Sequence, residues 1–167
     1  MKHLWLLLII VKLTAQIEVL PEGQAAFVQA MAMEQSGNLD GAIQIYNQIL
    51  NGDPNNQPAY FQLRNIFSKT GDPAAGILLI KNWLKNHPED LQSELTLGEC
   101  YFRNLEQEKA LEIWRHFRKT KLTNQTTYRL LFHTYIRFGQ TEAMESLVRD
   151  GRNQFNEPHF LAIDLAN

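Results

Sequence analysis

The chain of 167 residues has a single cysteine, Cys100, and no strong excess of charge of either sign. One cysteine excludes an intrachain disulfide framework and any thiolate metal cluster built from this chain alone. The 16 basic and 18 acidic residues give a net charge of -2, which provides no bulk attraction to nucleic acid or to an anionic membrane. Hydrophobic residues make up 44% of the chain and charged residues 20%, so the composition is that of a folded globular protein.

Signatures of enzymes are also missing from the sequence. It contains no Gly-rich phosphate loop, no GxSxG and no HExxH. No histidine has a second histidine one helical turn away, at the i, i+4 spacing of a metal-binding pair. Cys100 is expected to be a packing residue, because a reactive cysteine needs an exposed, electropositive setting. We therefore predict a non-catalytic protein with no catalytic residues, no cofactor and no metal site.

No apolar run is long enough to cross a bilayer. Met1–Ala15 (MKHLWLLLIIVKLTA) has a short basic start, an apolar stretch over 4–11 and a more polar end. A membrane-spanning helix needs about 20 residues, whereas this three-part pattern is typical of a secretory signal peptide. We predict a signal peptide over 1–15 and an exported protein, periplasmic or on the cell surface of a bacterial host, without a stable membrane span after cleavage. The alternatives are an uncleaved membrane anchor and a buried N-terminal helix.

What the chain does contain is an internal repeat with a period of 34. The related segments are Ser36–Asn56, Thr70–Asp90, Asn104–Asn124 and Phe138–Pro158, and their starts are evenly spaced at this period. One column at this spacing holds glycine in three of its four places: Gly37, Gly71, Leu105 and Gly139. Another column is large and apolar throughout: Tyr46, Ile80, Trp114 and Val148. Four unbroken periods predict a repeat protein.

Each period predicts two helices. In residues 57–90 the large side chains of the first helix fall on one face: Tyr60, Leu63, Ile66 and Phe67. Gly71 can end this helix in the left-handed conformation, and the second helix begins near Pro73 and stops before Pro88. A helix pair cannot bury its apolar face alone, so neighbouring pairs must stack. The predicted fold class is an all-α solenoid of antiparallel helix pairs.

The repeats resemble those of the tetratricopeptide family. The resemblance is carried by the GN-L-DGA-I-Q-I-Y pattern of Gly37–Tyr46, by Asp53-Pro54-Asn55-Asn56, and by LGECYF with EKALEIW in the third unit. It covers about residues 23–158 and implies a right-handed α-solenoid. The sequence departs from the family pattern at Gln29, Arg64 and Leu105, and Gly151 stands in a column of bulky residues.

The period and the resemblance together divide the chain. A lead-in over 16–22 follows the signal peptide; the four tetratricopeptide-like repeats are 23–56, 57–90, 91–124 and 125–158. Residues 159–167 are expected to be the first helix of an incomplete fifth repeat, because 165–167 fall in register with 63–65 and 97–99. We expect the natural protein to continue beyond this point. The alternative is that the exposed edge pairs with another subunit.

The resemblance also implies a binding surface, because proteins of this family usually bind partners along the concave face lined by the first helix of each repeat. Transferred by register, the predicted partner-binding residues are Phe27, Met31, Phe61, Asn65, Lys69, Leu95, Glu99, Phe102, Arg103, Arg129, His133 and Arg137. Such a groove suits a peptide or protein segment with apolar anchors and an acidic end. The alternative is that Lys69, Arg103 and Arg137 are cations placed near helix C-termini by the helix dipole.

Three functions remain open from the sequence. The first is an exported scaffold that binds a peptide or protein segment in its groove. The second is the N-terminal solenoid of a larger envelope enzyme or assembly factor, and the third is an oligomerisation module. Nucleic acid binding is not predicted, although Trp114–Lys121 mixes aromatic and basic residues, because Trp114 and Phe117 occupy core columns.

Overall fold

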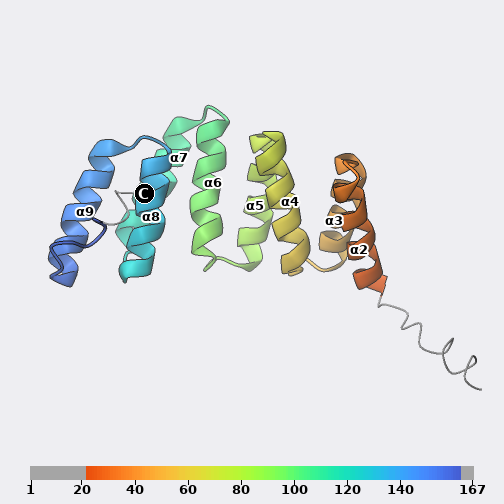
Figure 1. The fold of residues 1–167 in the computed structure, drawn as a ribbon, viewed down its shortest axis with the longest axis horizontal. Helices are drawn as coiled ribbons and strands as arrows, with labels where there is room; N and C mark the ends of the chain where they lie inside the picture. Colours follow the sequence, from red (N-terminus) through yellow and green to blue (C-terminus); the bar gives the residue numbers. More distant parts are fainter. Residues whose placement is uncertain (1–21, 163–167) are drawn as a thin grey trace, which may run out of the picture. The chain divides into compact units, whose positions relative to one another are not determined.

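The computed structural model describes residues 22–162, which form eight α-helices and no strand (Figure 1). The helices are α2 (Glu22–Gln35), α3 (Leu39–Gly52), α4 (Gln57–Thr70), α5 (Pro73–Asn86), α6 (Leu91–Arg103), α7 (Gln107–Thr120), α8 (Gln125–Arg137) and α9 (Thr141–Phe155). The prediction of an all-α fold is confirmed. The predicted signal peptide, and the lead-in up to residue 21, lie outside the described residues. Within 22–162, no helix has the length and apolar character that crossing a membrane requires.

The helices follow the period of the sequence. The first helices α4, α6 and α8 begin at Gln57, Leu91 and Gln125, and the second helices α5, α7 and α9 begin at Pro73, Gln107 and Thr141. The chain divides into a first unit, which ends at Gly52 and holds α2 and α3, and a second unit, which starts at Asp53 and holds α4 to α9.

In the first unit, small residues let two helices approach closely. Ala30 of α2 and Ala42 of α3 are both fully buried. Tyr46 of α3 packs its ring 5.5 Å from that of Phe27 and donates a hydrogen bond of 3.4 Å to the Glu34 carboxylate. Burial, together with the neighbouring Glu34 charge, raises the pKa of Tyr46 to about 12.

In the second unit, an N-cap recurs at the same place in each repeat. Asn56, Asp90 and Asn124 occupy one column of the repeat, immediately before α4, α6 and α8. Each side chain accepts a hydrogen bond from a backbone N–H in the first turn of its helix, that of Ala59, Ser93 and Thr127. Such a cap satisfies one of the amides that a helix leaves unpaired at its start, and so fixes where the helix begins.

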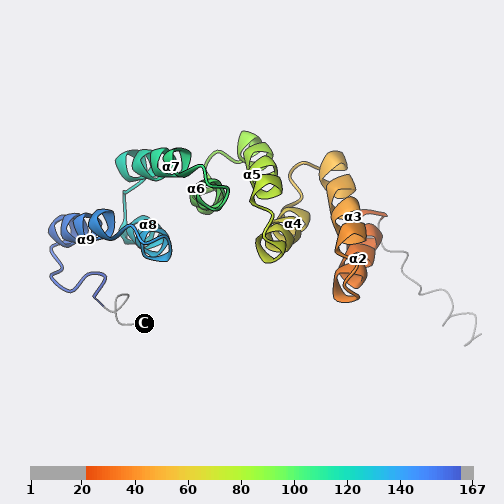
Figure 2. The same ribbon diagram turned by 90° about the horizontal axis from the view of Figure 1, so that it is seen from above.

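Helix α6 packs against three other helices of the second unit. It contacts α5 and α7 and also the first helix of the next repeat, α8 (Figure 2). Trp114 of α7 is fully buried against it, with its indole N–H 3.4 Å from the Leu95 carbonyl oxygen. The indole lies directly over Gly98, where a Cβ atom would fall inside the contact distance of Nε1. Glycine at position 98 is therefore what allows α6 and α7 to pack around an indole.

The same indole joins the third repeat to the fourth. Its ring lies 5.8 Å from that of Phe102, 5.4 Å from Phe138 and 6.3 Å from Tyr135. The surrounding buried cluster runs through α6 to α9 and beyond: Leu95, Ala110, Phe117, Tyr128, Leu131, Phe132, Tyr135, Leu147, Val148, Phe160 and Leu161. Burying an aromatic side chain of this size stabilises a fold by roughly 4–6 kcal/mol, on about 25 cal/mol for each Å² of apolar surface.

The fourth repeat ends differently from the prediction. Residues 158–162 form turns and not the helix expected from residue 159, and 163–167 lie outside the described residues. The ring of Phe160 fills the space left by Gly151, where a Cβ atom would come within 2.7 Å of it, and packs 5.1 Å from Phe155. Leu161 is buried with φ +62°, a left-handed conformation that interrupts a helix at this point.

The turns between the helices of each repeat share one backbone conformation. The residues in this column have φ values of +82° at Gly37, +70° at Gly71, +64° at Leu105 and +65° at Gly139. Leu105 thus adopts a conformation that glycine takes without steric penalty. Its side chain is 86% exposed, so little burial compensates the strain.

We expect Gly98→Ala to lower the free energy of unfolding by at least about 1 kcal/mol, since overpacking a well-filled core outweighs the helix propensity gained over glycine. Chemical denaturation followed by circular dichroism measures this. The control is Gly52→Ala in α3, where a Cβ atom meets nothing within 4 Å. Equal effects of the two substitutions would show that the indole does not require glycine at position 98.

We expect Leu105→Gly to raise the free energy of unfolding by about 1 kcal/mol, because it removes the Cβ penalty of a left-handed residue. The matched control is Leu78→Gly, which replaces another exposed leucine, but inside α5, and should lower stability by a similar amount. Thermal unfolding of both variants tests the difference. Destabilisation by Leu105→Gly would mean that the leucine side chain makes a stabilising contact.

Candidate functional site

The twelve predicted partner-binding residues fall in both units. Phe27 and Met31 lie on α2 of the first unit, where Met31 is exposed and Phe27 is half-buried against Tyr46. The other ten lie on α4, α6 and α8 of the second unit. In the second unit, two of them, Glu99 and Arg103, line a cavity.

Two of the predicted residues belong to the core. Leu95 is 0% exposed within the cluster around Trp114, so the prediction that it lines a binding surface is wrong. The reason is that α6 is packed by α5, α7 and α8, which leaves less of its surface open than the repeat register implies. Phe102 is half-buried, with its ring 5.1 Å from that of Phe138, and it also packs against the core.

The remaining aromatic and basic residues lie at or near the surface of the second unit. Phe61 is half-buried beneath Arg64, whose guanidinium carbon is 4.8 Å from the ring centre. Arg103 lies over the Phe138 ring at 5.6 Å, and Arg129 over the Phe160 ring at 5.5 Å. Four further members of the predicted set on these helices are also exposed: Asn65, Lys69, His133 and Arg137.

One ion pair links two of the predicted residues. Arg137 of α8 donates from Nη1 to both carboxylate oxygens of Glu99 on α6, at 2.8 and 2.9 Å. The Glu99 side chain is only 7% exposed, whereas that of Arg137 is 54% exposed. Glu99 is therefore neutralised within the chain and holds α8 against α6. The pair was detectable in principle, because the two residues are separated in sequence by one period plus one helical turn.

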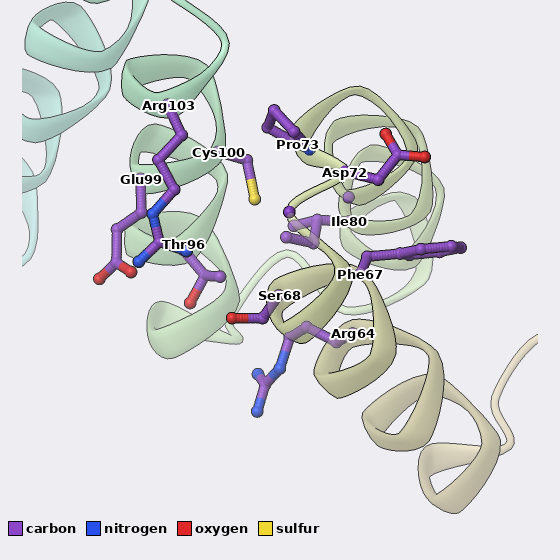
Figure 3. Close-up of a pocket in the computed structure, with 12 residues that line it drawn as sticks. Arg64, Phe67, Ser68, Asp72, Pro73, Ile80, Thr96, Glu99, Cys100 and Arg103 are labelled. Atoms are coloured by element: carbon purple, nitrogen blue, oxygen red, sulfur yellow. The ribbon is translucent and has the colours of Figure 1, made fainter. Parts of the chain in front are cut away.

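A cavity of about 220 Å³ lies between α4, α5 and α6 (Figure 3). Its apolar wall is formed by Phe67, Pro73, Gly76, Ile80 and Cys100. Ser68 and Thr96 add hydroxyl groups, and Arg64 and Arg103 lie on the α4 and α6 sides. Several of these residues are solvent-exposed, Ser68 and Arg103 among them, so the cavity is open to solvent.

Sequence reasoning did not find this cavity. It identified Arg64 only as a departure from the family pattern and Cys100 only as a packing residue. The structure places Gly76 against Cys100, so that a Cβ atom added to the glycine would lie 3.1 Å from the sulfur. The signal in the sequence that could have indicated the cavity is a pair of small residues, Gly76 and Cys100, on two neighbouring helices.

The side chains that line the cavity include two cations, Arg64 and Arg103, and two carboxylates, Asp72 and Glu99. Helices α4 and α8 contain no acidic residue, and α6 contains only Glu94 and Glu99. We call Arg64, Arg103 and Arg137 the arginine cluster. Arg137 is paired with Glu99, and Arg64 lies close enough to Asp90 to help hold the pKa of that carboxyl below its usual value. The carboxylate of Asp72 also lines the cavity, but it caps α5 by accepting the Ala75 N–H at 3.0 Å.

The thiol of Cys100 lies in the wall of the cavity. Burial raises the pKa of the Cys100 thiol, and Arg103 and Arg64 only partly oppose that effect. The neutral thiol is a poor nucleophile. Within residues 22–162, no three side chains of the His, Cys, Asp or Glu type come together as a metal site would need.

Comparison with solved structures shows the fold. The ArsTM double mutant of MamA RS-1 superposes with a TM-score of 0.56 at 14% identity, covering 81% of this chain and 78% of that one. MamA AMB-1 gives 0.55 at 14% identity over 87% and 79% of the two chains, and MamA MSR-1 gives 0.53 at 13% identity over 82% and 78%. MamA is a tetratricopeptide-like helical-repeat protein, so this chain has a helical-repeat solenoid fold.

No family model matches the chain, and no curated protein matches it in sequence.

We expect Arg137→Gln to lower the free energy of unfolding by about 1–3 kcal/mol, because it leaves the buried Glu99 carboxylate without its guanidinium. Glu99→Gln should cost less, since no buried charge remains. The double variant should lose less stability than the two single variants lose together, by at least about 0.5 kcal/mol. Urea denaturation of the three variants measures the coupling.

The control for this cycle is Arg115→Gln, which removes an exposed pair with Glu108 at 3.9 Å. Its effect should stay within about 0.5 kcal/mol. If Arg137→Gln and Arg115→Gln behaved alike, the Glu99 pair would have no structural role.

Proposed function

We propose that this chain is an exported, non-catalytic interaction scaffold of the tetratricopeptide type. It binds a segment of a partner protein on the face of its second unit that carries the arginine cluster. The fold supports this proposal, because stacked helix pairs present rigid surfaces on which a peptide can lie. The three-part pattern of 1–15 supports export.

The observation that carries the proposal is the juxtaposition of the arginine cluster with an apolar cavity. Arg64 and Arg103 lie beside a wall of apolar side chains on three helices. A guanidinium presents a rigid fork of donors that matches a carboxylate, and stacking on an aromatic ring holds it in place. Arg64 lies over Phe61 and Arg103 over Phe138 in this way. Arginine and aromatic side chains are enriched where proteins bind one another, which supports a binding role for this surface.

The choice of a polypeptide partner follows from the shape and chemistry of the site. The cavity receives one small apolar group, and the arginines extend beyond it along α4, α6 and α8. A segment that places one residue in the cavity and continues along the helices uses both features. Recognition by charged and apolar contacts on preformed helices needs no rearrangement of the repeat.

We expect affinity capture from envelope extracts to recover a partner with the wild-type chain and not with the double variant Arg64→Glu and Arg103→Glu. Reversal of two charges on the binding face replaces attraction to carboxylates by repulsion. Captured proteins are compared by quantitative mass spectrometry. Circular dichroism establishes that the variant keeps its helices.

The matched control is Lys81→Glu with Lys85→Glu, which makes the same change of charge on two exposed residues of α5. It should recover the same partner as the wild-type chain. Equal recovery by all three proteins would refute the proposal that this face binds the partner.

A further inference from the structure

Neighbouring repeats of the second unit are joined by a recurring contact between two helices. The second helix of one repeat packs against the first helix of the next, α5 against α6 and α7 against α8. At the first of these contacts Gly76 lies against Cys100, because a Cβ atom added to the glycine would be 3.1 Å from the sulfur. At the second, the ring centres of Trp114 and Tyr135 are 6.3 Å apart. The chain thus has one way of joining a helix pair to the next pair.

Helix α2, the first helix of the first repeat, exposes a face that α6 buries. Ala25, Val28 and Ala32 lie on one side of α2, at spacings of three and four residues, and we call them the α2 stripe. Two periods later, the columns of Ala25 and Ala32 hold Ser93, which is fully buried, and Cys100, which lies against α5. In α2 all three residues are exposed, Val28 at 54%. The α2 stripe therefore has the register of a surface that other repeats cover with a second helix.

Helix α9, the second helix of the fourth repeat, has an open hollow on the corresponding side. Its volume is about 510 Å³, and we call its lining residues the α9 hollow: Met144, Glu145, Val148, Arg149, Arg152 and Asn153. Arg152 stands one period after Arg118, which donates to the Ser146 hydroxyl of the following repeat at 2.9 Å. Met144 stands two periods after Gly76, which lies against the following repeat at Cys100. Both columns contact the next repeat where one follows, and in α9 they line a hollow that is open to solvent.

The charges of the two surfaces favour contact between α2 and α9 over contact between two α2 helices. Residues 22–52 contain the acidic residues Glu22, Glu34 and Asp40 and no Lys or Arg. The α9 hollow is lined by two arginines and one carboxylate. Two α2 helices would bring together only like charges, whereas α2 on α9 places an acidic unit beside a surface of net positive charge.

We propose that α2 of one copy packs on the α9 hollow of a second copy, in the way that α6 packs on α5. The α2 stripe then lies against Met144 and Val148. The contact is heterologous, so copies join head to tail into open chains. One helix face is a small interface, so the assembly depends on concentration. The inference goes beyond the proposed function, because it involves neither the arginine cluster nor the cavity between α4, α5 and α6.

Disulfide trapping tests the register of this contact. In a chain with Cys100→Ala, the variants Ala32→Cys and Met144→Cys are made separately; the two positions are those of Cys100 and Gly76, each shifted by two periods. We expect a mixture of the two, oxidised with copper phenanthroline, to form a disulfide-linked dimer with one chain of each kind. One of the chains carries a heavy nitrogen isotope, so intact mass spectrometry identifies the pair. The control is Met31→Cys, which is exposed on the same helix about 100° around from Ala32.

Two results of this experiment would overturn the inference. One is equal cross-linking of Met144→Cys to Met31→Cys and to Ala32→Cys, which would show contact without register. The other is cross-linking of Ala32→Cys chains to one another alone, which would show that α2 pairs with itself.

Sedimentation velocity of the full chain tests the assembly without cysteines. We expect the weight-average mass to rise with concentration above that of the monomer. Arg149→Glu should weaken association about tenfold, because it places a carboxylate in the α9 hollow opposite an acidic unit. The matched control is Arg115→Glu, which makes the same change of charge one period earlier, on α7, and should associate as the wild-type chain does. Circular dichroism establishes that each variant keeps its helices.

The same measurement can refute the proposal. A wild-type chain that stays monomeric at every concentration would overturn it, whether the α2 stripe is then covered by another segment of the same chain or by solvent. Equal association of the Arg149→Glu and Arg115→Glu variants would show that the α9 hollow is not part of the contact.

Discussion

The packing of the Trp114 indole onto the bare backbone of Gly98 is the contact on which the second unit depends. It brings α7 against α6, and the same ring reaches Phe138 at the end of α8, so one side chain joins two repeats. The position of α8 in turn sets where Arg137 meets Glu99. The neutralisation of Glu99 by Arg137 thus depends on how the Trp114 indole packs in the core.

The architecture was predictable because the residues that determine it recur along the chain with the period of the repeat. The starts of α4, α6 and α8 follow from caps that recur with the repeat, and the buried faces follow from apolar columns such as Tyr46, Ile80 and Trp114. Periodicity fails where one repeat differs from the others. Gly151 appeared only as a gap in a column, because the residue that fills the gap, Phe160, comes from a turn outside the repeat.

The candidate site was predictable only in part. Register placed Arg103, Glu99 and Arg137 on the first helices, and all three lie in or beside the site. Register also placed Leu95 there, although contacts from three helices bury it. The cavity depends on the volumes of side chains from separate helices and on the direction of long arginine side chains. The order of residue types along the chain specifies neither of them.

The caps Asn56, Asp90 and Asn124 have a consequence for how the chain can change in length. Each of them caps its helix through the same hydrogen bond. Removal of residues 91–124 would therefore join Asp90 directly to Gln125, so that α8 would still be capped and its apolar face would keep its orientation. A deletion that is not a whole number of periods would separate a cap from its helix or rotate the apolar face away from its neighbours. The period is therefore also the step in which such a protein can be lengthened or shortened by recombination without interrupting its helices.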